Sequence, residues 1–287
     1  MGTRIGGHYN RGTASLPLVT FVRSGLVLPD SDLHLWLLPL DAAAAAAATL
    51  AAFLSPDEHE RAARFRHADD VRRYRVARGA LRALLGRYLE REPGAIQFEY
   101  GAHGKPALAR DFARVDLRFN LSHSGDVALI AFGLGHSIGV DLEHGDRAVD
   151  ALALAGRYGS TRERAMLKTL DPGLRSRRFI ELWTCKEAWL KATGLGITAG
   201  LAEVDIEMSA ERPRIARMPL GQGSVEHWSL ALFEPAIGLV GAVALRDAGR
   251  ELGDIGERET GCIVPGLAGE RRVLTLRARQ GATTAPL

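Results

Sequence analysis

Cysteine is scarce in this sequence, which contains only Cys185 and Cys262 among its 287 residues. Two cysteines in so long a chain provide no disulfide framework and no set of thiolates for a zinc site. The fold must therefore depend on ordinary apolar cores, and the chain is long enough for two domains or one large one. We expect the protein in the reducing cytoplasm.

Long apolar runs are missing as well. The run from Ala42 to Ala48 has no large side chain and is flanked by Asp41 and Thr49, so it predicts a helix outside the membrane. The first ten residues contain one arginine and no continuous apolar segment, which does not fit a secretory signal. We therefore expect no membrane partner.

Aromatic side chains make up only 6% of the chain, and the net charge is only +3. The most basic segment, residues 58–91, has ten arginines against five acids but only three aromatics, Phe65, Tyr74 and Tyr88. Binding of single-stranded nucleic acid depends on stacking aromatics, so a nuclease or similar metal-dependent phosphotransferase is the weakest hypothesis. We expect no nucleic-acid partner, and the arginines favour phosphates of a smaller ligand.

One of these arginines, Arg78, stands on an apolar seam between Tyr74 and Leu81. A guanidinium in that position needs an anion. A bound phosphate and an internal Asp or Glu are both possible partners, and the long side chain could also extend past the seam to water. These alternatives remain open at the level of sequence.

The order of the predicted elements indicates an α+β fold with two similar halves. In each half, helices come before antiparallel strands, although no repeat is visible in the sequence. We expect an N-terminal extension (1–30), a first α+β half (31–137), a second half (138–246) and a tail (247–287) that is disordered or adds one strand. The predicted helices are 42–48, 56–91, 148–157, 160–170 and one that starts after the break at 171–173, contains 179–191 and ends near Gly194. The predicted strands are 33–38, 96–100, 119–123, 127–132, 138–143, 204–208, 228–233 and 238–245.

The strand predicted from Ile138 carries two carboxylates on one face, because Asp141 and Glu143 are two residues apart. Neighbouring carboxylates repel each other unless water or a cation lies between them. Oxygen ligands of this kind suit Mg²⁺ or Mn²⁺. The alternative is an exposed acidic strand end without a ligand.

The helix predicted over Phe179–Lys191 aligns Trp183, Glu187 and Lys191 along one side. One interpretation is a core helix with an ordinary surface pair between Glu187 and Lys191. The other takes Glu187 as a third carboxylate of the metal site, with Lys186 and Lys191 beside it. Three carboxylates, a metal and a lysine match the requirements of phosphoryl transfer.

Two further motifs are rich in groups that bind phosphate. Gly104-Lys105-Pro106 predicts a rigid turn that exposes a lysine. Ser122 and His123 end a predicted strand, where they could hold an oxyanion or simply satisfy a turn. A serine hydrolase does not fit, because no Gly-x-Ser-x-Gly elbow surrounds Ser122.

In this order and spacing, four motifs resemble those of the surfactin (Sfp) type of 4′-phosphopantetheinyl transferases: Gly104–Pro106, Phe119–Ser124, Gly139–Glu143 and Trp183–Lys191. The resemblance covers about residues 33–245. It implies a pseudo-dimer of two α+β halves, each an antiparallel sheet with packed helices, with the active site in the cleft between them. Such an enzyme transfers the 4′-phosphopantetheine arm of coenzyme A to a serine of an acyl or peptidyl carrier protein and releases adenosine 3′,5′-bisphosphate.

The resemblance also implies roles for individual residues. Asp141, Glu143 and Glu187 would hold Mg²⁺ or Mn²⁺, and Glu187 would also accept the proton of the carrier serine. Lys191 would contact the diphosphate and stabilise the charge that develops as its bond breaks. The residues expected to bind coenzyme A are Arg61, Arg73, Arg78, Lys105, Pro106, Ser122, His123, Lys186 and Lys191.

One departure from the family pattern concerns Glu58, which stands where some members have a lysine. This leaves the contacts to the 3′-phosphate open. The competing hypothesis is a module that holds coenzyme A or another anionic ligand without turnover. A monomer is expected, since two similar halves already form one cleft.

Overall fold

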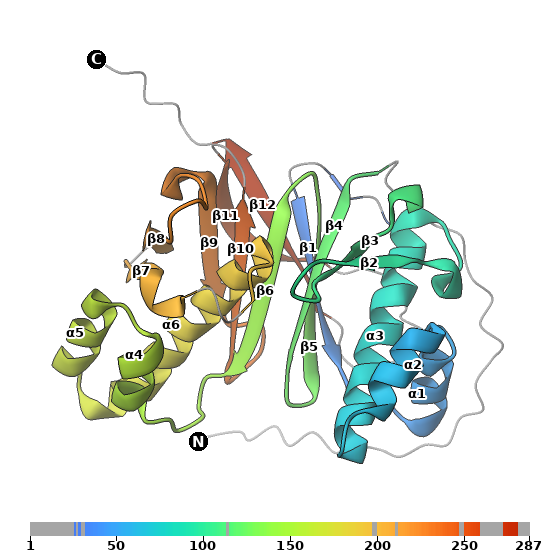
Figure 1. The fold of residues 1–287 in the computed structure, drawn as a ribbon, viewed down its shortest axis with the longest axis horizontal. Coiled ribbons are helices and arrows are strands. Elements are labelled where there is room, and N and C mark those ends of the chain that lie inside the picture. Colours follow the sequence, from blue (N-terminus) through green and yellow to red (C-terminus); the bar gives the residue numbers. More distant parts are fainter. Residues whose placement is uncertain are drawn as a thin grey trace, which may run out of the picture.

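Two antiparallel sheets lie side by side at the centre of the molecule, and a long helix packs on the outer side of each (Figure 1). The structure is a computed structural model, and it describes residues 26, 28–29, 32–112, 115–196, 200–209, 212–246, 250–258 and 272–280. The larger sheet has the strand order β11-β12-β1-β5-β4, and the smaller has the order β6-β10-β9. The predicted α+β fold with two halves is confirmed.

Most of the predicted elements are present, with ends shifted by a few residues. The helices are α1 (Ala44–Ala51), α2 (Pro56–Ala63), α3 (Ala68–Leu89), α4 (Ala151–Tyr158), α5 (Thr161–Thr169) and α6 (Pro172–Thr193). The strands are β1 (Asp32–Pro39), β2 (Phe98–Tyr100), β3 (Pro106–Leu108), β4 (Leu117–Ser124), β5 (Val127–Leu134), β6 (Ser137–His144), β7 (Asp205–Met208), β8 (Pro213–Arg217), β9 (Trp228–Phe233), β10 (Leu239–Arg246), β11 (Arg250–Arg258) and β12 (Arg272–Gln280). Of the helices in the described ranges, none is long and apolar enough to cross a bilayer.

Alternation along the strands divides the interior into three apolar clusters. On β1, Leu33, Leu35 and Leu37 face the smaller sheet, whereas Trp36 and Leu38 face α3. The cluster between the sheets also contains buried side chains of β5, β6 and β10. The two halves therefore share one apolar interface, and β4 and β6 meet along it beside the predicted site.

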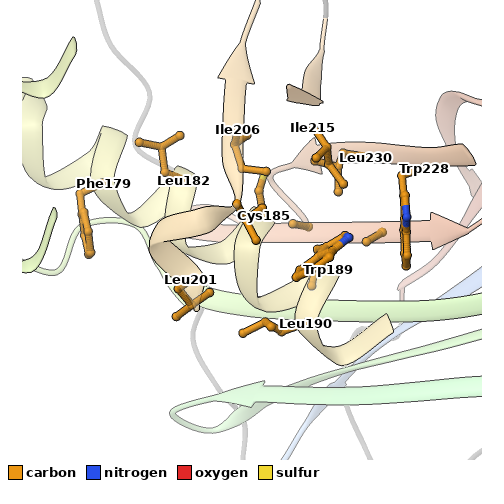
Figure 2. Packing of buried hydrophobic residues seen from close by; sticks show 14 of the residues in the cluster. Phe179, Leu182, Cys185, Trp189, Leu190, Leu201, Ile206, Ile215, Trp228 and Leu230 are labelled. Atoms are coloured by element: carbon orange, nitrogen blue, oxygen red, sulfur yellow. The ribbon is translucent and has the colours of Figure 1, made fainter. Parts of the chain in front are cut away.

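Helix α6 is buried around most of its circumference. Its outer cluster includes Cys185 and Trp189, and Figure 2 shows both packed among side chains of neighbouring elements. Trp189 is fully buried, and its ring lies 5.9 Å from that of Trp228 on β9. Burial of so large an apolar side chain stabilises the fold by about 2–3 kcal/mol. The helix is thus held in a fixed position on the smaller sheet.

A glycine lets α6 approach β6 closely. A Cβ atom on Gly139 would overlap Ala188 O and the backbone of Ala192, both on α6. These are backbone atoms, so a rotamer change cannot relieve the overlap. Gly139 therefore sets the distance between the strand that carries Asp141 and Glu143 and the helix that carries the third carboxylate.

Two predictions about secondary structure are wrong. The basic stretch is two helices, because helix α2 ends at Ala63 and α3 begins at Ala68. The tail supplies two strands instead of one, and β12 pairs with β1 so that Leu274 lies opposite Leu35. Neither the N-terminal extension up to residue 25 nor the end of the tail beyond residue 280 lies within the described residues.

Candidate active site

The two strand carboxylates point away from the sheet interface. Val140 and Leu142 occupy the face of β6 that enters the shared core, so Asp141 and Glu143 face α6. Asp141 Oδ1 accepts hydrogen bonds from Lys191 Nζ at 2.6 Å and from Ser122 Oγ at 2.8 Å. The expected meeting of this strand with the end of α6 is therefore present.

Glu143 lies further along the same strand face. Its Oε2 accepts a hydrogen bond from Ser124 Oγ at 3.3 Å, and Arg147 lies 3.8 Å away. Burial and the nearby charge of Asp141 raise the pKa of Glu143. A carboxylate in this environment is stabilised by additional positive charge.

Glu187 sits on α6 opposite these strand carboxylates and is only 8% exposed. Burial raises its pKa to about 7, the negative charges of Asp141 and Glu143 add to the increase, and Lys191 opposes it. A carboxyl group with a pKa near neutrality can accept and release a proton under ordinary conditions. Its chemistry therefore suits a general base.

The carboxylate oxygens retain unused capacity for a cation. Asp141 Oδ2 and Glu187 Oε1 are buried and have no hydrogen-bond partner, which is unfavourable for such oxygens. Oxygen donors of this type fit Mg²⁺. Within the described ranges, however, no three His, Cys, Asp or Glu side chains are placed as a metal-binding group. The positive charge beside Asp141 here is the Lys191 ammonium, so the three-carboxylate metal site remains a prediction.

A cavity of about 390 Å³ opens next to Lys191, between α3, the β2–β3 hairpin and the end of β4. A neighbouring cavity of about 250 Å³ contains Glu187 and Lys105 and shares Lys191 with the first. We call these two spaces together the site cleft. The predicted ligand-binding residues that line the first cavity are Arg61, Arg73, Arg78, Pro106, Ser122, His123 and Lys191.

Arg78 has an internal acidic partner. The buried Glu58 carboxylate accepts from Arg78 Nε and, at 2.6 Å, from Arg82 Nε, while Arg78 also donates to Tyr100 Oη at 2.8 Å. Burial acts to raise the pKa of Glu58, but the two arginines outweigh it and the pKa lies below its usual value. Glu58 thus fixes the orientation of Arg78 at the cavity wall.

The other two predicted arginines, Arg73 and Arg61, differ in whether an acidic side chain pairs with the guanidinium. Arg73 is held by Asp126 at 2.9 Å and by Asp70 at 3.2 Å. Arg61 is exposed, and its guanidinium has no hydrogen bond or ion pair to any of the described residues. Burial and the charges of Lys191 and Arg73 lower the pKa of His123, so this part of the cavity is electropositive and would favour an anion.

Lys105 links the hairpin to both elements that carry the carboxylates. Its Nζ donates to Ile138 O on β6 at 3.0 Å and to Ala192 O on α6 at 3.1 Å. Burial lowers its pKa to about 8, and the charge of Arg118 contributes. Lys105 therefore lies in the wall of the site cleft, and backbone carbonyls accept hydrogen bonds from its ammonium. Its contact with coenzyme A remains a prediction.

Lys186 does not reach the site cleft, which corrects its predicted role. Its side chain is buried on the other side of α6, where Nζ lies 2.6 Å from Glu163 Oε2 and donates to Tyr158 O and Leu201 O. Neighbouring residues on a helix point about 100° apart, so Lys186 and Glu187 face different surroundings. The structure gives no support for Lys186 as a ligand-binding residue.

Three aromatic side chains of the first cavity escaped prediction: Phe65, Tyr74 and Tyr100. Helical spacing contained a signal for Tyr74, which precedes Arg78 by four positions on α3 and so shares a helix side with it. Phe65 and Tyr100 had no comparable signal, since Phe65 lies between α2 and α3 and Tyr100 enters the cavity from the hairpin.

Comparison with known proteins agrees with this geometry. Residues 137–244 match the family described as 4′-phosphopantetheinyl transferase superfamily, and residues 41–133 match the one described as 4′-phosphopantetheinyl transferase, N-terminal. The chain is 41% identical over 224 residues to the 4′-phosphopantetheinyl transferase HetI of Nostoc sp., covering 78% of this chain and 92% of that protein. The 4′-phosphopantetheinyl transferase Sfp of Bacillus subtilis is 30% identical over 156 residues, 54% of this chain and 67% of Sfp.

A third relative, a putative 4′-phosphopantetheinyl transferase of Synechocystis sp., is 38% identical over 180 residues, which span 63% of this chain and 72% of that protein. Both halves of the fold are thus matched separately, and the four motifs fall within the matched ranges. The resemblance inferred from those motifs is confirmed. The chain belongs to the 4′-phosphopantetheinyl transferase superfamily.

Proposed function

We propose that this protein transfers the 4′-phosphopantetheine arm of coenzyme A to a serine hydroxyl of an acyl or peptidyl carrier protein and releases adenosine 3′,5′-bisphosphate. The observation that carries the proposal is that Lys191 lines both cavities of the site cleft, and so connects Glu187 in the smaller cavity with the arginines and His123 of the larger one. The volume of the larger cavity lies within the range of small-molecule sites. Membership of the family supports the same reaction.

Different parts of the site cleft would contact the nucleotide phosphates and the diphosphate of coenzyme A. Arg61 and Arg73 lie on the α2–α3 side of the cavity and would hold phosphate groups of the nucleotide end. His123 and Lys191 would contact the diphosphate. The reacting phosphorus would then lie near Glu187, which borders the adjoining cavity.

The chemistry follows from these placements. The carrier serine Oγ attacks the phosphorus that bears the pantetheine arm, and Glu187 takes up the hydroxyl proton. A new P–O bond forms to the serine as the bond to the bridging oxygen breaks. The bridging oxygen leaves on adenosine 3′,5′-bisphosphate with the bonding electron pair, and the Lys191 ammonium stabilises the developing charge.

We also propose Mg²⁺, with Mn²⁺ as the alternative, as the ion held by Asp141, Glu143 and Glu187. The unpartnered oxygens of Asp141 and Glu187 support this assignment. When bound, the ion would neutralise charge on the diphosphate. Serine attack, proton transfer and charge stabilisation remain assigned to the chain's own residues and the carrier.

Intact-mass measurement tests the reaction directly. Several apo carrier proteins are incubated with the protein, coenzyme A and Mg²⁺, and a gain of roughly 340 Da on one serine is expected. Glu187→Gln and Asp141→Asn should abolish most of the gain. Unchanged labelling by either variant would refute the assigned site, and binding of coenzyme A without any labelling would favour the non-catalytic module.

A further inference from the structure

Behind the β2–β3 hairpin lies a cavity that the transfer reaction does not use. Its volume is about 560 Å³, larger than either part of the site cleft. Its walls are formed by the first residues of β4 and β6, by the β2–β3 hairpin and by the end of α6. Its lining includes none of Asp141, Glu143, Glu187 or Lys191. We call it the rear cavity.

The rear cavity has a charged rim. Lys105, Arg110 and Arg118 line it, against a single acid, Asp116. Arg118 Nε already donates to Asp116 Oδ1 at 2.6 Å, which neutralises that acid. Two of the three cations therefore face the rear cavity without an acidic partner in its lining.

Arg110 is the most available of these cations. Its backbone N–H is bonded to Glu99, which does not line the cavity, but its exposed guanidinium has no hydrogen bond or ion pair within the described part of the chain. Burial lowers the pKa of Lys105, and the charge of Arg118 adds to the decrease. An anion placed beside Lys105 would stabilise its charged form.

Apolar side chains also line the rear cavity. Val115, which is 46% exposed, and the half-buried Leu108 and Pro106 present accessible apolar surface in its wall. An apolar wall beneath a cationic rim is complementary to a molecule with an apolar body and one anionic group. A fully hydrated ion would gain nothing from this wall.

The geometry points to the rear cavity as a second binding site, for a small amphipathic anion that carries a carboxylate or a phosphate on an apolar body. Its apolar part lies against Val115 and Leu108. Its anionic group lies between Arg110 and the Nη groups of Arg118, whose Nε is the atom that Asp116 holds. This site goes beyond the transfer reaction, although Lys105, Pro106 and Gly194 border both the rear cavity and the site cleft.

Calorimetric titration with three eight-carbon probes tests the chemistry. Octanoate carries a carboxylate, octyl phosphate a phosphate, and octanol neither. One of the two anions should bind at one site with Kd below about 1 mM, and octanol at least tenfold more weakly. The preferred anion identifies the head group. Equal binding of octanol, or no binding of either anion, would overturn the proposal.

Variants locate the bound anion. The double variant Arg110→Gln, Arg118→Gln should weaken binding by about tenfold or more, and both side chains are exposed enough for the fold to survive. Arg61→Gln, in the site cleft, serves as the matched control and should leave the affinity within twofold. Loss of binding in Arg61→Gln but not in the double variant would place the anion in the site cleft and refute the proposal.

Competition separates this site from the proposed reaction. Saturating coenzyme A should leave octanoate binding unchanged, whereas displacement would assign the octanoate to the site cleft. If coenzyme A itself does not bind, the proposed function fails. The arginine variants would still test whether the rear cavity binds the anion.

Discussion

Lys191 and Asp141 join helix α6 to strand β6, with Nζ of the lysine 2.6 Å from Oδ1 of the aspartate. The Asp141 side chain is 6% exposed and the Lys191 side chain 30%. The charge of this ammonium also acts on Glu187, where it opposes the increase in pKa that burial and the strand carboxylates cause. Lys191 therefore compensates the charge of Asp141, and it is also placed to contact a phosphate in the site cleft.

Lys191→Met should reduce carrier labelling by about a hundredfold or more, because an oriented charge at the breaking bond is lost. Initial rates at saturating coenzyme A measure this. Lys191→Arg keeps the charge and should retain more activity than Lys191→Met. Lys168→Met on α5 is the control, since Lys168 is exposed and far from the cleft lining, and it should stay within twofold. A wild-type rate in Lys191→Met would refute the role.

The part of the site that β6 and α6 form could be predicted from the sequence, because the relevant patterns are local. Alternation placed Asp141 and Glu143 on one face, and the buried partners Val140 and Leu142 explain why that face is the outer one. The resemblance then connected strand and helix. The sequence could not predict that the Arg61 guanidinium has no ion pair to the described residues, because ion pairs depend on which acidic side chains the fold brings near.

Other features had no local signal. Helix α6 buries Cys185, Lys186, Glu187, Ala188, Trp189 and Leu190 in succession. A helix buried on all sides offers no periodicity that separates the face of Lys186 from the face of Glu187. Pairing of β12 with β1 is likewise invisible, since it joins opposite ends of the chain.

Gly139→Ala should destabilise the fold by about 1–3 kcal/mol, because the added methyl group overlaps the α6 backbone. Labelling should fall as well, since any outward shift of α6 moves Glu187 from the strand carboxylates. Thermal unfolding and labelling rates measure the two effects. Gly156→Ala is the matched control. A Cβ at Gly156 meets nothing within 4 Å, and alanine favours the helix by roughly 0.5–1 kcal/mol. Equal melting temperatures of Gly139→Ala and wild type would contradict the close approach.

Lys186→Met should lower stability and leave ligand binding intact. Removal of one partner from the buried Lys186–Glu163 pair costs about 3–5 kcal/mol, whereas the site cleft loses no lining group. Urea unfolding gives the stability, and the KM for coenzyme A should stay within twofold where the variant is folded.

A second substitution serves as the control for Lys186→Met. Glu163→Gln in the same chain removes the unpaired buried charge. Its single amide oxygen can still accept one of the two N–H groups, of Ser160 and Ile206, that the two carboxylate oxygens accept. The double variant should therefore recover part of the stability. A tenfold rise in KM for Lys186→Met at unchanged stability would instead restore the lysine to the binding site.

Glu58→Gln tests the anion that orients Arg78. Glu58 is 1% exposed and compensates both Arg78 and Arg82, so its neutralisation should cost about 3 kcal/mol or more near neutral pH. Because the pKa of Glu58 is lower in the folded protein than its usual 4.5, its contribution is complete above that value and is lost as pH falls through the folded pKa.

The stability difference between wild type and Glu58→Gln should therefore shrink in acid. Urea unfolding near pH 7 and at successive steps below about pH 4.5 measures it. Glu60→Gln is the control, because the neighbouring Glu60 is exposed, and it should show little difference at any pH. A difference for Glu58→Gln that stays constant into strong acid would mean that its carboxylate charge does not hold the two arginines. Arg78 would then owe its orientation at the cavity wall to Tyr100 and to packing on Phe98.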